Sequence, residues 1–385
     1  MKNYFSSNFK LGVLGGGQLG RMLLAETQKF DIHTSILDAD SNAPCAQICN
    51  EFHQGDLLDY DTVYNFGKQV DLLTIEIENV NIDALDTLEA EGLTIYPKPK
   101  NLRTIQNKAH QKVFYHDKGI PTADFSRFTS LEELKHSIHN EAISFPFVWK
   151  SARFGYDGNG VKIVKSIHDL NNLPSGECIA EKLVPFKNEL AVIVARNAKG
   201  ETKTYPVVEM EFHPEANQVE YVICPARIEA HVAQKAREVA LKVADTFGFV
   251  GLLAVEMFQT EDDQILVNEV APRTHNSGHY SIEASYTNQF EQHLRSILNL
   301  PLGNTDSKVT GIMVNLVGAE GYTGEVVYEN IEEILKINGV TPHIYGKRTT
   351  KPFRKMGHVT IVNEDINEAR KIAQQVKETI KVIAK

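Results

Sequence analysis

The stretch ILVNEVAPRTHNSGHYSIEA, residues 265–284, gathers reactive side chains directly after one predicted strand. Its apolar start predicts a buried strand that also carries Asn268 and Glu269. The chain then turns polar and presents Arg273, His275, Asn276, Ser277 and His279. Scaffolds present reactive groups in such segments. A purely structural strand end does not need all of these groups together, so the stretch predicts a functional site.

The residues before this stretch predict a β-hairpin with a metal site. In GLLAVEMFQTEDDQILVNEVAPR, two apolar runs flank an acidic turn. A turn centred between Asp262 and Asp263 places Glu256 opposite Glu269 on one face. Directly opposed like charges destabilise a sheet, whereas a magnesium ion between them would reverse that effect. The alternative is a different register that leaves one glutamate in solvent.

Length, composition and charge exclude several classes of protein. A chain of 385 residues is too long for one ordinary core, so we expect two or three domains. The formal net charge of -10 disfavours nucleic-acid binding. The N-terminus does not resemble a signal peptide, and no apolar run reaches membrane-span length. The four cysteines are scattered, which favours reduced thiols in a cytoplasmic protein over a zinc site.

Residues 1–105 predict an N-terminal domain with a Rossmann-like parallel sheet. The glycine-rich GGGQLG, residues 15–20, follows a short apolar strand and precedes a helix. Its backbone N–H groups and the helix N-terminus could bind a nucleotide phosphate, with Gln18 and Leu19 as candidate contacts. A tight strand-to-helix turn without a ligand is the alternative. Asp38, at the end of the next strand, would also suit a dinucleotide.

The same domain has a second candidate position in DLLTIEIENV, residues 71–80. We expect this strand to carry Glu76 and Glu78 on one face and to end at Asn79. Ligands of open α/β sheets bind beyond the carboxyl ends of strands, so either glutamate could face a site. Both could equally be solvated charges at the strand end.

We expect two helices over roughly residues 100–118. Residues 106–300 predict a second domain, with a lid of about residues 120–185. In FPFVWKSARFGYDGNGVKIV, two strands flank the loop GYDGNG, residues 155–160, which can cover phosphates with its backbone N–H groups. Lys150 lies within the first apolar strand, where an unpaired ammonium is costly to bury. A triphosphate would be a natural partner, unless the lysine reaches the edge of the strand.

The next segments predict contacts to a nucleoside. Glu181 could accept a hydrogen bond from an adenine amine, and the backbone of Lys182, Leu183 and Val184 offers the alternating donor and acceptor that an adenine edge needs. Glu189 could accept from ribose hydroxyls. His213 follows a strand, and a lone histidine is often structural.

Residues 301–385 predict a small α/β module. We expect strands at residues 309–317 and 343–345 and at HVTIV, then a final helix over residues 366–383. The module could be a scaffold or a dimer face, and it could at the same time carry Lys347.

In order, GYDGNG, EKLV, the two hairpin glutamates and APRTHNSGHYSIEA resemble the ATP-grasp ligases. Within them the chain resembles the family of 5-(carboxyamino)imidazole ribonucleotide synthases nearly end to end. The C-terminal pair HIYGK (residues 343–347) and RKMGH (residues 354–358) belongs to this likeness. The implied fold is a three-domain ATP-grasp architecture of mixed α/β and α+β class.

The resemblance implies roles residue by residue. ATP would be held by Lys108, Lys150, Gly155, Tyr156, Asp157, Gly158, Asn159, Gly160, Glu181, Lys182, Leu183, Val184, Glu189, His213, Asn268 and Glu269. The ribonucleotide and the bicarbonate-derived group would be surrounded by Gln18, Leu19, Glu76, Tyr156, Asp157, Arg273, His275, Asn276, Ser277, Lys347 and Arg354. Glu256 and Glu269 would hold magnesium, and Asp157, Arg273 and Lys347 would be catalytic. The chain departs from the family's usual residues at Lys108, Asn159 and Thr274.

The implied reaction is an ATP-dependent carboxylation in purine biosynthesis. ATP would phosphorylate bicarbonate to carboxyphosphate, and the exocyclic amine of 5-aminoimidazole ribonucleotide would attack the carboxyl carbon or released carbon dioxide. Lys150, Arg273 and magnesium would stabilise the phosphoryl transfer. Asp157 would accept the amine proton. The resemblance also implies a homodimer.

Three other interpretations stay open at this point. A nicotinamide-dependent dehydrogenase would use GGGQLG and Asp38 but leaves the hairpin glutamates without a role. A different ATP-grasp enzyme would keep ATP and magnesium and change the acceptor. A non-catalytic nucleotide-binding protein would bind ATP without releasing ADP.

Overall fold

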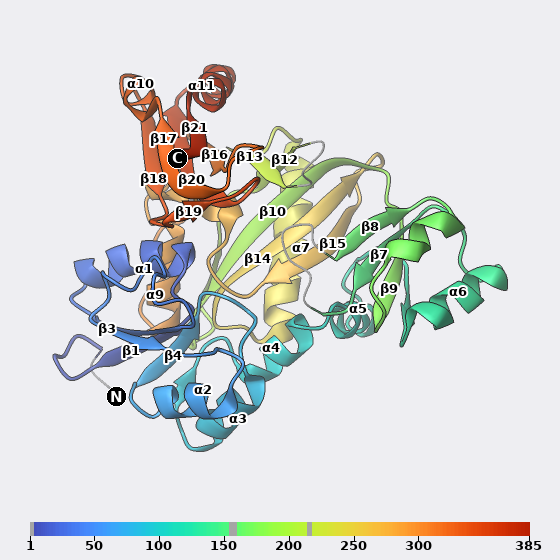
Figure 1. The fold of residues 1–385 in the computed structure, drawn as a ribbon, viewed down its shortest axis with the longest axis horizontal. Coiled ribbons are helices and arrows are strands. Elements are labelled where there is room, and N and C mark those ends of the chain that lie inside the picture. The colour runs from blue at the N-terminus through green and yellow to red at the C-terminus, as the bar shows by residue number, and fades with distance from the viewer. Residues whose placement is uncertain (1–3, 154–159, 214–217) are drawn as a thin grey trace.

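The computed structural model describes residues 4–153, 160–213 and 218–385 (Figure 1). An N-terminal unit, a central unit with a protruding four-stranded sheet, and a C-terminal unit follow one another along the chain. Helices and strands are mixed throughout, and the first sheet is parallel. The predicted fold class is therefore confirmed.

The N-terminal unit is a five-stranded parallel sheet in the order β3-β2-β1-β4-β5. Its central strands β1 and β4 are nearly continuous apolar runs, as expected when helices cover both faces, whereas the edge strand β3 carries Glu51, His53 and Gln54. Its elements are β1 (Lys10–Leu14), α1 (Gln18–Lys29), β2 (His33–Asp38), β3 (Glu51–Gln54), α2 (Tyr60–Gly67), β4 (Leu72–Ile75), α3 (Ile82–Ala90) and β5 (Thr94–Ile95).

The predicted extent of the strand carrying Glu76 and Glu78 was wrong. Strand β4 ends at Ile75, because its partner β1 ends at Leu14 and leaves no further ladder to pair with. The two glutamates therefore do not share a strand face. They lie in the turn beyond the carboxyl end of the sheet, where each is half-buried.

A small antiparallel sheet in the order β6-β9-β7-β8 protrudes from the body of the molecule (green in Figure 1). Two helices lead into it, at the positions that the sequence predicts. The elements are α4 (Pro99–Ile105), α5 (Lys108–Asp117), β6 (Phe125–Phe128), α6 (Leu131–His139), β7 (Phe147–Ser151), β8 (Val161–Val164), η1 (Ile167–Asn172) and β9 (Cys178–Lys182). Strands β7 and β8 pair as a hairpin, which confirms the strands predicted on either side of the glycine loop.

Parts of two predicted segments differ in detail. Residues 155–159 of the predicted phosphate loop lie outside the described residues, and only Gly160 is described. The sequence predicts that Leu183 and Val184 continue the strand after Lys182, but β9 ends at Lys182 and these two residues follow it.

The centre of the molecule is a nine-stranded sheet, β15-β14-β10-β12-β13-β16-β20-β18, with β11 paired to β10. Helix α7 covers one face, where its apolar side chains join Leu190, Leu253 and Val267 in the largest core cluster. The elements of the central unit are β10 (Phe186–Arg196), β11 (Thr202–Thr204), β12 (Val208–Phe212), β13 (Val219–Cys224), α7 (Ala230–Phe247), β14 (Gly251–Thr260), β15 (Ile265–Ala271), η2 (Asn276–Gly278), α8 (Ser281–Ala284) and α9 (Gln289–Ile297).

The C-terminal unit continues the central sheet, because β13 pairs with β16. Its elements are β16 (Thr310–Val317), β17 (Gly324–Glu329), α10 (Ile331–Ile334), β18 (Val340–Ile344), β19 (Thr349–Thr350), β20 (Lys355–Asn363), α11 (Ile366–Thr379) and β21 (Lys381–Ala384). The final helix was predicted too long: it ends at Thr379, and Lys381–Ala384 pairs with β17 as a strand. The alternating segment KVIA buries Val382 in the core, which a helical continuation would not do.

No helix within residues 4–153, 160–213 and 218–385 has the length and apolar character needed to cross a membrane.

Candidate active site

The hairpin of β14 and β15 places Glu256 opposite Glu269, as the sequence predicts. The predicted turn centre was nevertheless wrong. Close to the turn, Met257 pairs with Val267 and the turn is centred on Asp262, one half-position earlier than expected. The pairing of the glutamates is recovered because the register shifts between Glu256 and Met257.

The register shift is a β-bulge that adds Asn268 to strand β15. Val267 and Val270 both lie in the core on the α7 side. Two residues between them, Asn268 and Glu269, therefore lie on the opposite side. Both contact lysines there: Asn268 Oδ1 accepts from Lys150 Nζ at 2.8 Å, and Glu269 pairs with Lys108. Regular strand alternation would have sent these two side chains to opposite faces.

Three lysines from two elements meet at this face of the hairpin. Lys108 and Lys112 lie one turn apart on α5, and Lys150 lies on β7. Glu181 on β9 holds two of them, with Oε2 at 2.9 Å from Lys150 Nζ and Oε1 at 3.0 Å from Lys112 Nζ. The two lysine side chains and Glu181 are almost fully buried. The cluster therefore presents several cations around one carboxylate.

The charges of this cluster shift one another's pKa values. Burial works to raise the pKa of Glu181, but Lys112 and Lys150 together outweigh it and lower that pKa. Burial lowers the pKa of Lys112 to about 8, against the opposing effect of Glu181. Burial also raises the pKa of Glu189 on β10 to about 7, which Lys150 only partly offsets. Cations predominate near Glu181, so the cluster suits an anionic ligand.

The two facing glutamates differ in their ionisation. Burial, followed by the negative charge of Glu269, raises the pKa of Glu256. Lys108 lowers the pKa of Glu269. The pKa values of the two facing carboxyl groups are therefore shifted in opposite directions, as expected for two carboxylates that share one site.

The segment after β15 connects the hairpin to other parts of the fold. His275 Nε2 lies 3.3 Å from Glu256 Oε1, and His275 Nδ1 lies 2.9 Å from the hydroxyl of Ser277. Arg273 Nε lies 2.9 Å from Glu78 Oε1 in the N-terminal unit. Asn276 exchanges two hydrogen bonds with Asn315 on β16. Arg273 and His275 thus face the site, whereas Asn276 contributes to domain contact.

The glycine loop of the N-terminal unit holds carboxylates of the protein itself. Gly17 N and Gly20 N each donate to Glu76 at 2.8 Å, and Gly16 N donates to Asp38 at 2.6 Å. These N–H groups therefore donate to carboxylates of the protein, whereas the sequence predicts that they bind a nucleotide phosphate. Gly15 has a φ of +98°, and a Cβ there would lie 2.5 Å from Glu76 Cγ, so this position of the loop requires glycine. Gln18 is half-buried at the start of α1, and the Leu19 side chain packs in the core.

The basic residues of the C-terminal unit lie on the connection between β18 and β20. Lys347 Nζ donates to Lys355 O at 2.7 Å and lies 5.7 Å from the ring of Tyr345. Arg354 Nη1 donates to Thr349 O at 2.7 Å. The positive charge of Lys355 works to lower the pKa of Glu256. The connection therefore extends toward the hairpin glutamates.

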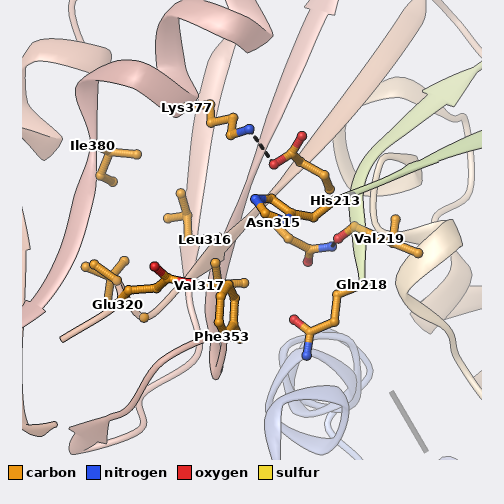
Figure 2. A pocket seen from close by; sticks show the side chains of 14 residues that line it. His213, Gln218, Val219, Asn315, Leu316, Val317, Glu320, Phe353, Lys377 and Ile380 are labelled. Atoms are coloured by element: carbon orange, nitrogen blue, oxygen red, sulfur yellow. Dashed lines mark hydrogen bonds and ion pairs between the residues drawn. The ribbon is translucent and has the colours of Figure 1, made fainter. Parts of the chain in front are cut away.

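His213 lies apart from the lysine cluster. It lines a pocket with about 770 Å³ of space, partly open to solvent, between the β12–β13 hairpin and the C-terminal unit (Figure 2). Its ring lies 6.1 Å from that of Phe353. None of the lysines of the site lines this pocket. The other residues predicted to contact the adenine edge differ in exposure. The Lys182 side chain is exposed, and Leu183 and Val184 are half-buried.

Sequence reasoning missed two residues of the lysine cluster, Lys112 and Gln111. Lys112 follows Lys108 by four positions on a predicted helix, and residues four apart share one helix face. That spacing is the signal that could have identified it. Thr122, which Lys112 contacts, carried no such signal.

Three family models together cover most of the chain. An ATP-grasp domain matches residues 113–290, a ribonucleotide synthetase preATP-grasp domain matches residues 9–106, and a phosphoribosylaminoimidazole carboxylase C-terminal domain matches residues 311–372. Their order along the chain is that of the three structural units.

Curated and solved proteins agree with these models. The N5-carboxyaminoimidazole ribonucleotide synthase of Bacillus subtilis (strain 168) is 38% identical, over 93% of this chain and 92% of its own. The synthetase of that name from Thermotoga maritima has a solved structure with a TM-score of 0.89 and 40% identity, covering 98% of this chain and 100% of its own. A synthase from Aspergillus clavatus, solved with ADP and 5-aminoimidazole ribonucleotide, has a TM-score of 0.88 and 35% identity, covering 97% and 98%.

Proposed function

The chain belongs to the N5-carboxyaminoimidazole ribonucleotide synthase family of ATP-grasp ligases, and we propose how its residues divide the work of that family's reaction. It is an ATP-dependent carbon–nitrogen ligase of purine biosynthesis that carboxylates 5-aminoimidazole ribonucleotide to N5-carboxyaminoimidazole ribonucleotide. The same relatives exclude the three other interpretations, which are a dehydrogenase, an ATP-grasp enzyme with another acceptor and a non-catalytic nucleotide-binding protein.

We propose bicarbonate as the source of the carboxyl group. The γ-phosphoryl group of ATP passes to a bicarbonate oxygen and gives ADP and carboxyphosphate. The exocyclic amine of the ribonucleotide then bonds to the carboxyl carbon, the bond from that carbon to the phosphate oxygen breaks, and one amine proton leaves. Positioning and charge stabilisation carry such a reaction, because carboxyphosphate must be kept from water.

The lysine cluster at the β14–β15 hairpin is the observation that carries the ATP assignment. Lys108 and Lys150 supply cations for the phosphates, and the bulge brings Asn268 beside them. Glu189 on β10 suits the ribose hydroxyls. Glu181 on β9 has less support as the acceptor of the adenine amine, because its two oxygens face Lys112 and Lys150. The phosphate loop at residues 155–159 and its proposed proton acceptor Asp157 lie outside the described residues.

Magnesium fits the facing carboxylates of Glu256 and Glu269. The donors are hard oxygens, and magnesium takes one or two carboxylates together with substrate phosphates. The buried like-charge pair, in which Glu256 has a raised pKa, is the arrangement that a divalent cation would relieve. When bound, the ion would neutralise charge on the transferred phosphoryl group. Within the described residues no set of three His, Cys, Asp or Glu side chains gathers as a metal site.

We assign the ribonucleotide to the space between the three units. Glu76 and the Arg273–Glu78 pair border it from the N-terminal side and the hairpin side. Lys347 and Arg354 lie on the C-terminal connection, where cations suit a ribose phosphate. His213 lies in a separate pocket, so its proposed contact with ATP has less support than that of Lys108 or Lys150.

We also propose that the protein is a cytoplasmic homodimer. The homodimer follows from the family resemblance, and the cytoplasmic location follows from the four free cysteines, which suit a reducing compartment. Light scattering during size exclusion tests the dimer, since a mass near twice 43.1 kDa is expected.

The test of the reaction is ADP release with magnesium, ATP and bicarbonate, with and without 5-aminoimidazole ribonucleotide. Strong stimulation by the ribonucleotide is expected. Lys150→Met should reduce kcat/KM for ATP by about 100-fold or more, and Lys235→Met, an exposed lysine of α7, should not. ADP release that ignores the ribonucleotide would contradict the proposed acceptor, and the absence of ADP release would contradict the assignment as a whole.

A further inference from the structure

Lys112 is a buried cation that the reaction described above does not use. Its side chain is 3% exposed, as is that of Glu181, and Lys150 is 8% exposed. A buried lysine is costly unless its charge and its hydrogen-bonding capacity are satisfied. Solubility and surface charge therefore do not explain why a lysine occupies position 112.

On one side, Lys112 shares a carboxylate with Lys150. Lys112 Nζ lies 3.0 Å from Glu181 Oε1, and Lys150 Nζ lies 2.9 Å from Glu181 Oε2. Each oxygen of Glu181 thus faces one ammonium group. Lys150 makes a second contact, to Asn268 Oδ1 at 2.8 Å. Since an ammonium group has three N–H donors, the two contacts leave one for a ligand.

On the other side, Lys112 is tied to strand β15. Lys112 Nζ donates to the hydroxyl of Thr122 at 2.6 Å, and that hydroxyl donates to Val267 O at 2.7 Å. Val267 N in turn donates to Pro121 O at 2.8 Å. Val267 directly precedes Asn268, the bulge residue that contacts Lys150. The contacts therefore close into a ring that joins α5, the protruding sheet and β15.

We propose that Lys112 is a positioning residue for ATP, which holds one oxygen of Glu181 so that Lys150 keeps an N–H donor directed at a phosphate. The proposal rests on the assignment of ATP to the lysine cluster. Without Lys112, both oxygens of Glu181 would be open to Lys150, and a bidentate contact would use its remaining donor. The link from Thr122 to β15 also fixes the ring relative to the hairpin glutamates.

The charge of the cluster supports this role. Glu181 balances only one of the two lysines, so the ring retains a positive charge until an anion binds. Burial lowers the pKa of Lys112 to about 8 in the absence of such an anion. Burying a charged lysine is unfavourable, and it is expected where the phosphates of a ligand neutralise the remaining positive charge.

The experiment compares Lys112→Met with Lys118→Met, an exposed lysine at the end of the same helix. ATP affinity is measured by titration calorimetry, and KM for ATP and for the ribonucleotide and kcat by ADP release. Lys112→Met should weaken ATP binding and raise KM for ATP by about tenfold, as for the loss of a charge-assisted contact. The KM for the ribonucleotide should change less than about twofold if distant sites are independent, and Lys118→Met should match the wild type. ATP affinity and KM within twofold of the wild type would overturn the proposal, as would equal rises in both KM values.

A second pair of variants tests the ring without changing its charge. Thr122→Val removes the hydroxyl that joins Lys112 to Val267 at nearly constant volume, and Thr122→Ser keeps it. We expect Thr122→Val to weaken ATP binding by about threefold or more, since it leaves buried polar groups without a partner, and Thr122→Ser to restore it. Equal ATP affinities in the two variants would overturn the link to β15. If Lys112→Met does not fold, the two Thr122 variants still test whether the ring around Lys112 supports ATP binding.

Calorimetry separates this proposal from the reaction. A wild type that binds ATP but releases no ribonucleotide-dependent ADP would contradict the proposed reaction while the effect of Lys112 on ATP binding is still measured.

Discussion

Glu256 illustrates how one neighbouring residue and burial set the behaviour of a single side chain. Its side chain is 15% exposed and faces Glu269 across the hairpin. Glu269 keeps its charge because Lys108 lowers its pKa, and Glu256 then has a raised pKa through burial and that charge. The pair is therefore unfavourable for the apo-protein and favourable for cation binding.

Glu256→Gln should stabilise the apo-protein in a pH-dependent way. Above the ordinary glutamate pKa of 4.5, the unfolded chain loses the proton that folded Glu256 retains, so stability falls as pH rises toward the folded pKa. The variant should melt no higher than the wild type near pH 4.5 and higher at pH 8, by about 2–4 °C for each kcal/mol. Thermal melts across this range test it, with Glu261→Gln in the exposed turn as the control. A constant difference across the pH range would contradict the assigned ionisation.

At the scale of secondary-structure elements, the bulge in β15 decides what the hairpin presents. The core face is kept by Val267 and Val270, and the extra residue between them turns Asn268 to the same side as Glu269. One strand end thereby contributes both an amide to Lys150 and a carboxylate to Lys108.

Deletion of Asn268 should leave the fold and remove this contact. The strand would regain regular alternation, with Val267 and Val270 still in the core and Glu269 still opposite Glu256. We expect a circular dichroism spectrum like that of the wild type and ATP binding weakened by about tenfold, as for a lost hydrogen bond to a charged group. Deletion of Asp262 in the turn is the comparison, since it shortens the hairpin far from Lys150. Unchanged ATP affinity without Asn268 would show that the bulge does not serve the site.

Three histidine rings join the strands that carry the C-terminal cations to the segment after β15. His358 on β20 stacks between His279 and His343, with ring centroids 4.7 and 4.5 Å apart. Tyr345 Oη lies 3.0 Å from His358 Nδ1. Burial lowers the pKa of His279 and His358 well below the usual range, so these rings stay neutral. The stack lies beside the connection that holds Lys347 and Arg354.

His358→Ala should loosen the C-terminal connection more than the ATP cluster. The buried cavity should cost about 2–4 kcal/mol. We expect KM for the ribonucleotide to rise and KM for ATP to stay near the wild-type value, because Lys347 lies two residues past Tyr345 and the ATP cluster lies on other elements. Steady-state kinetics test this, with the exposed His231→Ala as the control. A larger effect on KM for ATP than on KM for the ribonucleotide would refute it.

At the scale of the whole molecule, helix α9 joins the N-terminal unit to the central sheet. Figure 1 shows it beside α1, and its residues Phe290, Leu294 and Ile297 join Leu23 in one core cluster. His293 of the same helix lies 3.1 Å from Thr74 on β4. The site between the units depends on the packing of α9 against the N-terminal unit, because Glu78 belongs to the N-terminal unit and Arg273 to the central unit.

Leu294→Ala should weaken the joint between the units. A fully buried leucine replaced by alanine costs about 2–5 kcal/mol. We expect differential scanning calorimetry to show a lower-temperature transition of the N-terminal unit, separate from that of the central sheet. Leu335→Ala, where the leucine is 58% exposed, should melt like the wild type. A single transition at the wild-type temperature would contradict this function of α9.

Apolar periodicity, glycine positions and charge alone determined the βαβ opening, the two helices before the protruding sheet and the β14–β15 hairpin. The facing pair of Glu256 and Glu269 was predicted from a turn centre half a position too late, and the bulge compensates for that difference. These features depend on neighbours in the chain, and local spacing records them. Three outcomes depended on the tertiary structure: the bulge at Asn268, the contact of Glu76 with the glycine loop, and the ring around Lys112. The contact of Glu76 and the ring around Lys112 join residues far apart in the sequence, and helix or strand spacing carries no information on such partners. The bulge interrupts the alternation on which the strand prediction rests. The packing of separate elements against one another therefore decided which charges meet at the site.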